Sequence, residues 1–172
     1  VATADAAPAP LLDGLTSPTL VVLTGDHGES LGEHGETTHG LFAYEATLHV
    51  PLVLAGPGVE PGRDARSARH VDVLPTILAS LGVPIQPSLP GRSLLGAPDP
   101  AALTYFEALS SQLNRGWAPL TGILRGREKY VDLPVRELYD LASDPKELTN
   151  LAPARDAAVR DLARLLPPDA RK

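Results

Sequence analysis

The sequence predicts an α/β fold with a small β-rich carboxyl subdomain, and three observations lead to it. Two short apolar runs, at residues 20–23 and 51–55, each end at glycines, as buried parallel strands in an α/β sheet do. A helical pattern with one apolar face lies at residues 73–81. Short strand patterns and a terminal helical pattern follow from residue 102 onward. We therefore expect parallel strands at about residues 20–24 and 50–55, flanked by helices.

Composition and pattern divide the chain into three segments. Residues 1–18, rich in Ala and Pro, are expected to form a flexible arm or linker. Residues 19–100 form the α/β segment, and residues 101–172 form the carboxyl subdomain with strands and a terminal helix. Within this subdomain we expect strands at residues 102–107, 120–125, 129–133 and 138–141, then a helix at 153–166. Gly126-Arg127 should form a hairpin turn between the second and third of these strands, and Tyr139 and Leu141 should be core residues.

The helix expected at residues 73–81 has signals for its beginning and its end. Asp72 can cap its amino end, and Gly82 followed by Pro84 ends it. Its apolar face is formed by Val71, Leu74, Ile77, Leu78 and Leu81.

Composition excludes several classes of function. The 172 residues include 15 basic and 21 acidic side chains, and the net charge of −6 argues against a nucleic-acid partner. No apolar run reaches about 18 residues, so we expect no membrane-spanning segment in this chain. Cysteine is absent, which excludes thiolate catalysis and thiolate metal ligands. The chain begins with Val1 and contains no methionine, so we expect a processed chain or a fragment.

A polar loop with five glycines follows the first strand, at residues 25–40. Asp26 and His27 lie side by side at its start, where ligands bind in open α/β sheets. A carboxylate beside an imidazole can form half of a divalent-metal site. The alternative is a loop without a ligand, in which His27 is hydrogen-bonded to the backbone.

Four segments of this chain, in this order, resemble the sulfatase family of the alkaline-phosphatase superfamily. The first contains Asp26-His27-Gly28-Glu29 and continues to residue 40. The others are residues 50–53, residues 70–78 with 91–94, and residues 137–151. The resemblance implies that the chain is the carboxy-terminal part of a sulfatase domain and forms part of an alkaline-phosphatase-like sandwich. It also favours a periplasmic or secreted protein.

The resemblance also implies roles for single residues. Asp26 matches a carboxylate ligand of the catalytic ion, and His27 occupies the adjacent ligand position. His39 stands where the family has a basic residue that contacts the sulfate or the leaving oxygen. For Glu29, Glu33 and His34 we expect contacts to the metal ligands or to the substrate rather than to the ion itself, with shaping of the loop as the alternative for Glu29 and Glu33. The family commonly binds calcium, whereas an imidazole at position 27 favours zinc or manganese.

The sequence departs from the family at the nucleophile. Sulfatases use a cysteine or serine in a Cys/Ser-x-Pro-x-Arg motif, and this chain has no cysteine. Residues 88–92 spell Ser-x-Pro-x-Arg, but they lie downstream of the metal motif, whereas the family places its nucleophile upstream. We therefore expect the isolated chain to be inactive and to need the upstream half of the domain as its partner.

Three functions remain open from the sequence. The first is a metal-dependent hydrolase of sulfate esters, acting on a small-molecule or glycan substrate. The second is phosphoryl chemistry in the same superfamily, by a hydrolase or a phosphoethanolamine transferase. The third is a truncated, non-catalytic fragment. The segment at residues 137–151 favours the sulfatase.

Overall fold

The computed structural model describes residues 2–170 and divides the chain into two compact units. Unit 1 contains the described residues up to Thr24, then Leu52–Asp64 and His70–Ala97. Unit 2 contains Gly25–Pro51, Ala65–Arg69 and the described residues from Pro98 onward. This division differs from the predicted segments, because the glycine-rich loop groups with the carboxyl strands.

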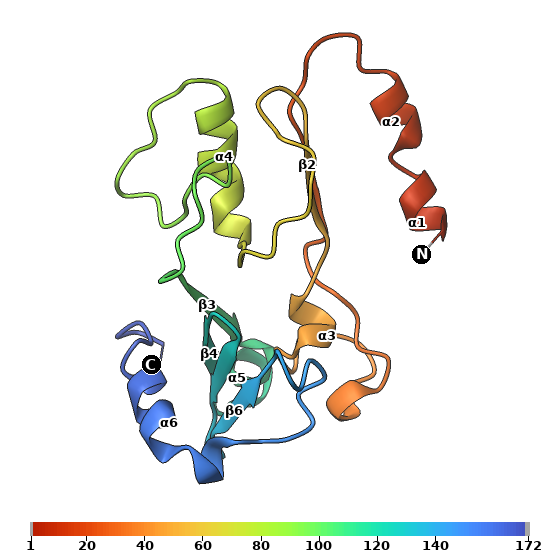
Figure 1. Ribbon diagram of the computed structural model, residues 1–172. Helices are drawn as coiled ribbons and strands as arrows, with labels where there is room; N and C mark the ends of the chain where they lie inside the picture. Colours follow the sequence, from red (N-terminus) through yellow and green to blue (C-terminus); the bar gives the residue numbers. More distant parts are fainter. Residues whose placement is uncertain (1, 171–172) are drawn as a thin grey trace. The chain divides into compact units, whose positions relative to one another are not determined.

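Unit 2 is built on a four-stranded antiparallel sheet in the order β3-β4-β5-β6 (Figure 1). The strands are β3 (Leu103–Ala108), β4 (Leu120–Arg125), β5 (Glu128–Asp132) and β6 (Glu137–Asp140). Gly126 has φ 61° in the turn between β4 and β5, a conformation that glycine adopts without strain. The predicted hairpin is therefore confirmed, as are the strands on either side of it.

Both faces of this sheet are covered within unit 2. Alternate strand residues point to opposite faces, so Tyr130 and Leu138 face one way and Val131 and Tyr139 the other. On the first face they pack with Leu162 of helix α6 (Asp156–Ala163), which runs along the sheet in Figure 1. The second face packs against Ala43, with partly buried Phe42 and Tyr44 beside it. The segment after the glycine-rich loop therefore completes the core, and the prediction that Tyr139 and Leu141 are core residues is confirmed.

The first two strands pair with each other in unit 1. β1 (Val21–Thr24) and β2 (Leu52–Ala55) form a two-stranded antiparallel ribbon, with Val21 opposite Ala55 and Thr24 opposite Leu52. The prediction of buried parallel strands is wrong on both counts. The two strands pair in antiparallel orientation, and Leu23 and Val53 remain 40% and 49% exposed. An apolar run shows that a strand prefers an apolar environment, but it carries no information on strand direction.

Helix α4 (Val73–Ser80) confirms the predicted helix, preceded by a 3-10 turn, η2 (His70–Asp72). The predicted cap by Asp72 is wrong, because its carboxylate makes no cap hydrogen bond. Asp72 is buried and its Oδ1 instead accepts the backbone N–H of Arg92, at 2.9 Å. Thr76 accepts the N–H of Leu94, also at 2.9 Å, so the buried face of α4 holds the following loop.

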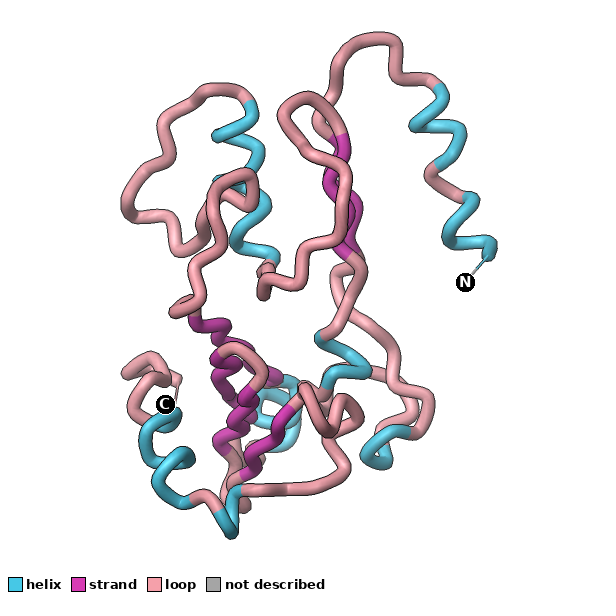
Figure 2. The backbone as a smooth tube through the Cα atoms, in the orientation of Figure 1, coloured by secondary structure: helices cyan, strands magenta, loops and turns pink. Residues whose placement is uncertain are grey.

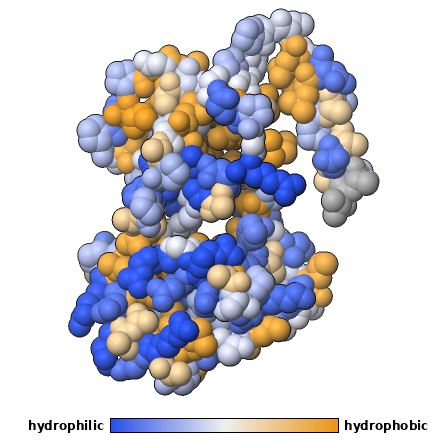
Figure 3. Space-filling model, viewed as in Figure 1, coloured by the Kyte–Doolittle hydropathy of each residue, from blue (hydrophilic) through white to orange (hydrophobic). Residues whose placement is uncertain are grey.

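The predicted apolar face of α4 is largely exposed in unit 1. Leu74 and Leu81 have exposed fractions of 51% and 69%, whereas Pro75 and Thr76 are buried. Apolar side chains are visible at the surface over α4 and the loop after it in Figure 3. The predicted core face of α4 is therefore not buried within unit 1.

The segment at residues 1–18, expected as an arm or linker, contains two short helices. These are α1 (Ala2–Ala6) and α2 (Ala9–Asp13), and α2 has no buried residue. The remaining elements are η1 (Glu33–Gly35), α3 (Glu45–Leu48), α5 (Ser110–Arg115) and η3 (Ala152–Ala154). Long loops connect the elements (Figure 2). Within residues 2–170, no helix has both the length and the apolar character that crossing a bilayer requires.

We expect Leu162→Ala to lower the free energy of unfolding by about 2–5 kcal/mol, because it leaves a cavity between α6 and the sheet. Leu162 is fully buried, whereas nearby Leu165 is 39% exposed. Leu165→Ala, the matched control, should therefore cost about 1 kcal/mol or less. Urea unfolding followed by circular dichroism measures both. Equal losses would show that α6 does not cover the sheet.

Candidate functional site

The site loop, residues 25–40 of unit 2, is held in a defined shape by backbone hydrogen bonds. The N–H of Gly28 donates to the Thr47 carbonyl in α3, at 2.8 Å. A Cβ on residue 28 would overlap the Ala46 carbonyl oxygen, so this close approach requires glycine. The N–H of Ser30 donates to the Thr38 carbonyl, at 2.9 Å. This second bond joins the two arms of the loop and brings residue 29 beside residue 39.

Asp26 presents its carboxylate to solvent at the start of the site loop. Its Oδ1 accepts the backbone N–H of His27, at 3.0 Å, and its side chain is 91% exposed. That N–H is the main reason why the pKa of Asp26 lies below its ordinary value. Asp26 is therefore a carboxylate at neutral pH, as a metal ligand must be.

His27 is oriented by its own backbone. Its Nδ1 lies 2.8 Å from the Gly28 carbonyl oxygen, which can only accept, so Nδ1 carries the proton. The neutral ring then has its lone pair on Nε2, which is 3.7 Å from Oδ2 of Asp26. Two acceptor atoms that face each other at this distance are compatible with a cation between them. A backbone bond at Nδ1 is also the usual way in which a metal-binding histidine is oriented.

His39 lies against His27, and Glu29 orients it. The two imidazole centroids are 3.9 Å apart, with 32° between the ring planes. The Nδ1 of His39 is 3.2 Å from Oε1 of Glu29 and 3.3 Å from Oε2, so the carboxylate accepts the Nδ1 proton. Nε2, on the other side of the His39 ring, takes no part in this contact with Glu29. Asp26, His27, Glu29 and His39 form one cluster, which we call the site group.

Glu33 and His34 make other contacts. Oε2 of Glu33 accepts the N–H of Leu31, at 2.6 Å, and this bond lowers the pKa of Glu33. His34 stacks on Tyr44, with centroids 3.6 Å apart, and its Nε2 lies 3.1 Å from the Lys146 carbonyl oxygen. Glu33 thus shapes the loop, and His34 attaches the loop to the carboxyl part of unit 2.

The donor set for a metal is partial. Among residues 2–170, no three His, Cys, Asp or Glu side chains are arranged to hold an ion. Asp26 and His27 supply two donors, whereas metal sites in proteins normally need four or more. One carboxylate and one imidazole suit zinc or manganese better than calcium. The residues fit part of a divalent-metal site.

Several residues that support the site loop were not found from the sequence. Glu36 is buried and its carboxylate accepts the N–H of Leu41, at 2.8 Å, where the loop ends. Lys129 and Glu147 are buried charges in contact with Glu45 of α3. The alternation of β5 contains a signal for Lys129, because this lysine shares a face with the core residue Val131. A lysine at such a position needs a carboxylate partner.

The site loop lies in a region that matches a known family. The sulfatase family model matches residues 10–83. The chain is 36% identical over 152 residues to a choline-sulfatase from Rhizobium meliloti, covering 83% of this chain and 30% of that protein. It is 35% identical over 156 residues to arylsulfatase K from Bos taurus, covering 81% and 28% of the two chains. The chain therefore spans less than a third of the length of these curated relatives.

Solved structures agree in fold. A sulfatase from Bacteroides fragilis superposes with a TM-score of 0.74 at 23% identity, covering 86% of this chain and 34% of that one. A phosphonate monoester hydrolase from Silicibacter pomeroyi gives a TM-score of 0.69 at 26% identity, covering 95% and 36%. The structure of BT4656 in complex with D-glucosamine-2-N,6-O-disulfate gives 0.70 at 25%, covering 86% and 33%. The chain belongs to the sulfatase family, with the alkaline-phosphatase-like fold of that family.

Proposed function

We propose that the site group forms part of the active site of a metal-dependent hydrolase that cleaves sulfate esters. The observation that carries this proposal is the convergence of Asp26, His27 and His39 on one exposed surface of the site loop. The chain's similarity to sulfatases over four-fifths of its length supports the proposal.

In this proposal Asp26 and His27 hold a divalent ion, and His39 contacts the substrate. A bound divalent ion supplies Lewis-acid polarisation of a sulfate oxygen. His39, oriented by the bond from its Nδ1–H to Glu29, acts in the doubly protonated form, in which Nε2–H donates to the sulfate or to the leaving oxygen. Zinc or manganese suits this donor pair, and calcium is the alternative that the family favours.

The rest of the site comes from residues outside this set. Two donors bind an ion weakly, so we infer that further ligands and the nucleophile lie in another part of the sulfatase domain. The exposed apolar side chains of α4 in unit 1 support this inference, because another part of the domain could pack against them. Ser88 is not proposed as the nucleophile, since it lies in a loop of unit 1 and downstream of the metal motif, whereas the family places its nucleophile upstream.

The relatives support a class of substrate for this proposal. A choline-sulfatase, arylsulfatases and a glucosamine disulfate complex favour a sulfated small molecule or glycan. The likeness to a phosphonate monoester hydrolase makes phosphoryl monoesters the second class. A sulfate monoester and a phosphonate monoester are both tetrahedral at the central atom and each carry one negative charge, so one site can accept both.

We expect Mn²⁺ to bind this chain weakly, at millimolar concentrations, and to broaden the ring signals of His27 first. The physical reason is that two donors converge at one point of the site loop. Proton NMR of the folded chain during a Mn²⁺ titration measures this effect, independently of any enzymatic activity.

The matched variants are His27→Ala and His49→Ala. His49 is an exposed histidine whose ion-pair partner is Glu45 rather than a site-group residue. His27→Ala should abolish the selective broadening at the site loop, and His49→Ala should preserve it. Equal broadening of all histidine signals would contradict a specific site. Tight stoichiometric binding would show that the chain has a fuller donor set than we propose.

We expect His39→Ala to lower kcat on an aryl sulfate by about 10²–10⁴-fold in an active sulfatase domain that contains these residues. The loss reflects one missing donor to the developing negative charge. The isolated chain should show negligible turnover. Parallel assays on an aryl phosphonate identify the preferred class of substrate.

Leu165→Ala serves as the control, because this exposed side chain lies outside the site loop. An unchanged kcat in His39→Ala would contradict the proposed contact between His39 and the substrate. Hydrolysis by the isolated chain that disappears in Ser88→Ala would place the nucleophile within this chain and contradict a partial site.

A further inference from the structure

We propose that Glu147 and Lys129, far from the site loop in sequence, position that loop by clamping helix α3 and His34. The clamp consists of Glu45, Lys129 and Glu147, together with the carbonyl group of Lys146. Both residues act through α3 and the loop rather than on a substrate, so they are positioning residues. Their importance for catalysis rests on the proposed function, whereas the clamp itself is a property of unit 2.

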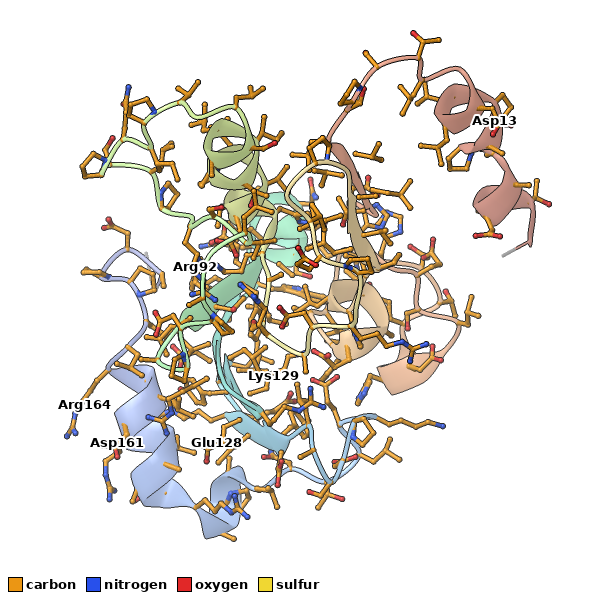
Figure 4. All side chains as sticks on the ribbon, turned by 45° about the horizontal axis from the view of Figure 1, so that its top comes forward. Asp13, Arg92, Glu128, Lys129, Asp161 and Arg164 are labelled. Atoms are coloured by element: carbon orange, nitrogen blue, oxygen red, sulfur yellow. The ribbon has the colours of Figure 1, made fainter. Side chains whose placement is uncertain are left out.

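A buried ion cluster forms the centre of the clamp. The side chains of Lys129 and Glu147 are each only 1% exposed, and Nζ of Lys129 lies 2.6 Å from Oε1 of Glu147. Nζ is also 3.2 Å from Oε1 of Glu45, and it lies 5.2 Å from the ring centroid of Phe106. Lys129 is labelled in Figure 4, where β5 carries it. One ammonium group thus joins β5 to α3 and to the turn after β6.

The cluster continues to the site group through α3. The other carboxylate oxygen of Glu147, Oε2, accepts the backbone N–H of Glu45, the first residue of α3, at 2.6 Å. At the far end of this one-turn helix, the Thr47 carbonyl accepts the N–H of Gly28. The Gly28 carbonyl then accepts Nδ1–H of His27. Only α3 and one residue therefore separate the clamp from the imidazole proposed as a metal ligand.

The residue before Glu147 holds a second point of the loop. The Lys146 carbonyl oxygen lies 3.1 Å from Nε2 of His34, whose ring stacks on Tyr44. The Tyr44 hydroxyl donates to Oε2 of Glu137 in β6, at 3.0 Å. Positions 146 and 147 therefore fix the loop at two separate places. With two points of attachment, the site loop cannot rotate about a single contact.

Glu147 has an unfavourable backbone conformation and a buried carboxyl group, and its role in the clamp explains why both are present. Glu147 has φ 56°, a left-handed conformation that non-glycine residues rarely adopt. Burial raises the pKa of its carboxyl, and the Lys129 ammonium opposes this shift. Oδ1 and Oδ2 of Asp144 hold the turn by accepting the N–H groups of Leu148 and Thr149. Buried ion pairs add little net stability, so their value lies in fixing one arrangement of the segments they join.

Hydrogen exchange of the folded chain tests the clamp directly. In Glu147→Ala we expect the Gly28 amide to exchange at least 10-fold faster relative to the Val159 amide. The Gly28 amide reports the bond to Thr47, and the Val159 amide reports helix α6. Glu147→Gln, which retains an acceptor for Glu45 N–H but loses the charge, should give an intermediate acceleration. This order of variants would show positioning by both the acceptor and the charge.

Leu162→Ala is the control for general loss of stability. It should accelerate Gly28 and Val159 together, because it weakens the core without touching the clamp. If Glu147→Ala also accelerated both amides equally, the proposal would be overturned.

His34→Ala tests the second attachment without leaving a buried charge unpaired, and it serves should Glu147→Ala not fold. We expect the Ser30 amide, bonded to the Thr38 carbonyl, to exchange at least 5-fold faster relative to Val159. An unchanged ratio would overturn the second attachment. The Mn²⁺ titration separates the two proposals. If Mn²⁺ fails to reach His27 while Gly28 exchange depends on Glu147, the metal role fails and the clamp stands.

Discussion

A lysine ammonium inside unit 2 is the constraint on which the rest of that unit depends. Lys129 is on a central strand, and its side chain cannot stay charged there without carboxylate partners. Its two partners come from α3 and from the turn after β6, segments that are 102 residues apart in the chain. The charge therefore fixes how the site loop is seated on the sheet. The apolar contacts of Ala43 with the same sheet face reinforce this seating.

Within the site group, one backbone carbonyl and one carboxylate fix which atoms the two imidazole rings present. The Gly28 carbonyl places the proton of His27 on Nδ1, and the carboxylate of Glu29 does the same for His39. Both imidazoles then present Nε2 away from these bonds. In the proposed function these bonds hold the two rings in the orientation that a ligand requires, which lowers the reorganisation cost of binding. Only two donors converge on a common point, and this limits what the group can do by itself.

Local sequence patterns predicted the parts of the structure that depend on near neighbours. The turn at Gly126, the strands beside it and helix α4 all follow from periodicity and turn chemistry within a few residues. The proximity of Asp26 and His27 is likewise local. Parts that depend on distant partners were not predictable. Asp72 receives an N–H from a residue 20 positions away rather than capping its own helix. The direction of β1 and β2 depends on which strand pairs with which, and an apolar run does not specify that.

The seating of the site loop on strands β5 and β6 has a consequence for how such proteins diverge and can be recombined. Residues 25–50 are not a transferable cassette, because their shape is encoded jointly with positions more than 80 residues away. A loop exchanged between two relatives would bring the side chains of its site group but leave behind the ammonium, the carboxylate and the carbonyl that hold the loop. Substitutions at positions 34, 44 and 45 are therefore expected to be inherited together with those at 129, 137 and 147. Recombination points for chimaeric enzymes are better placed so that both stretches come from the same parent.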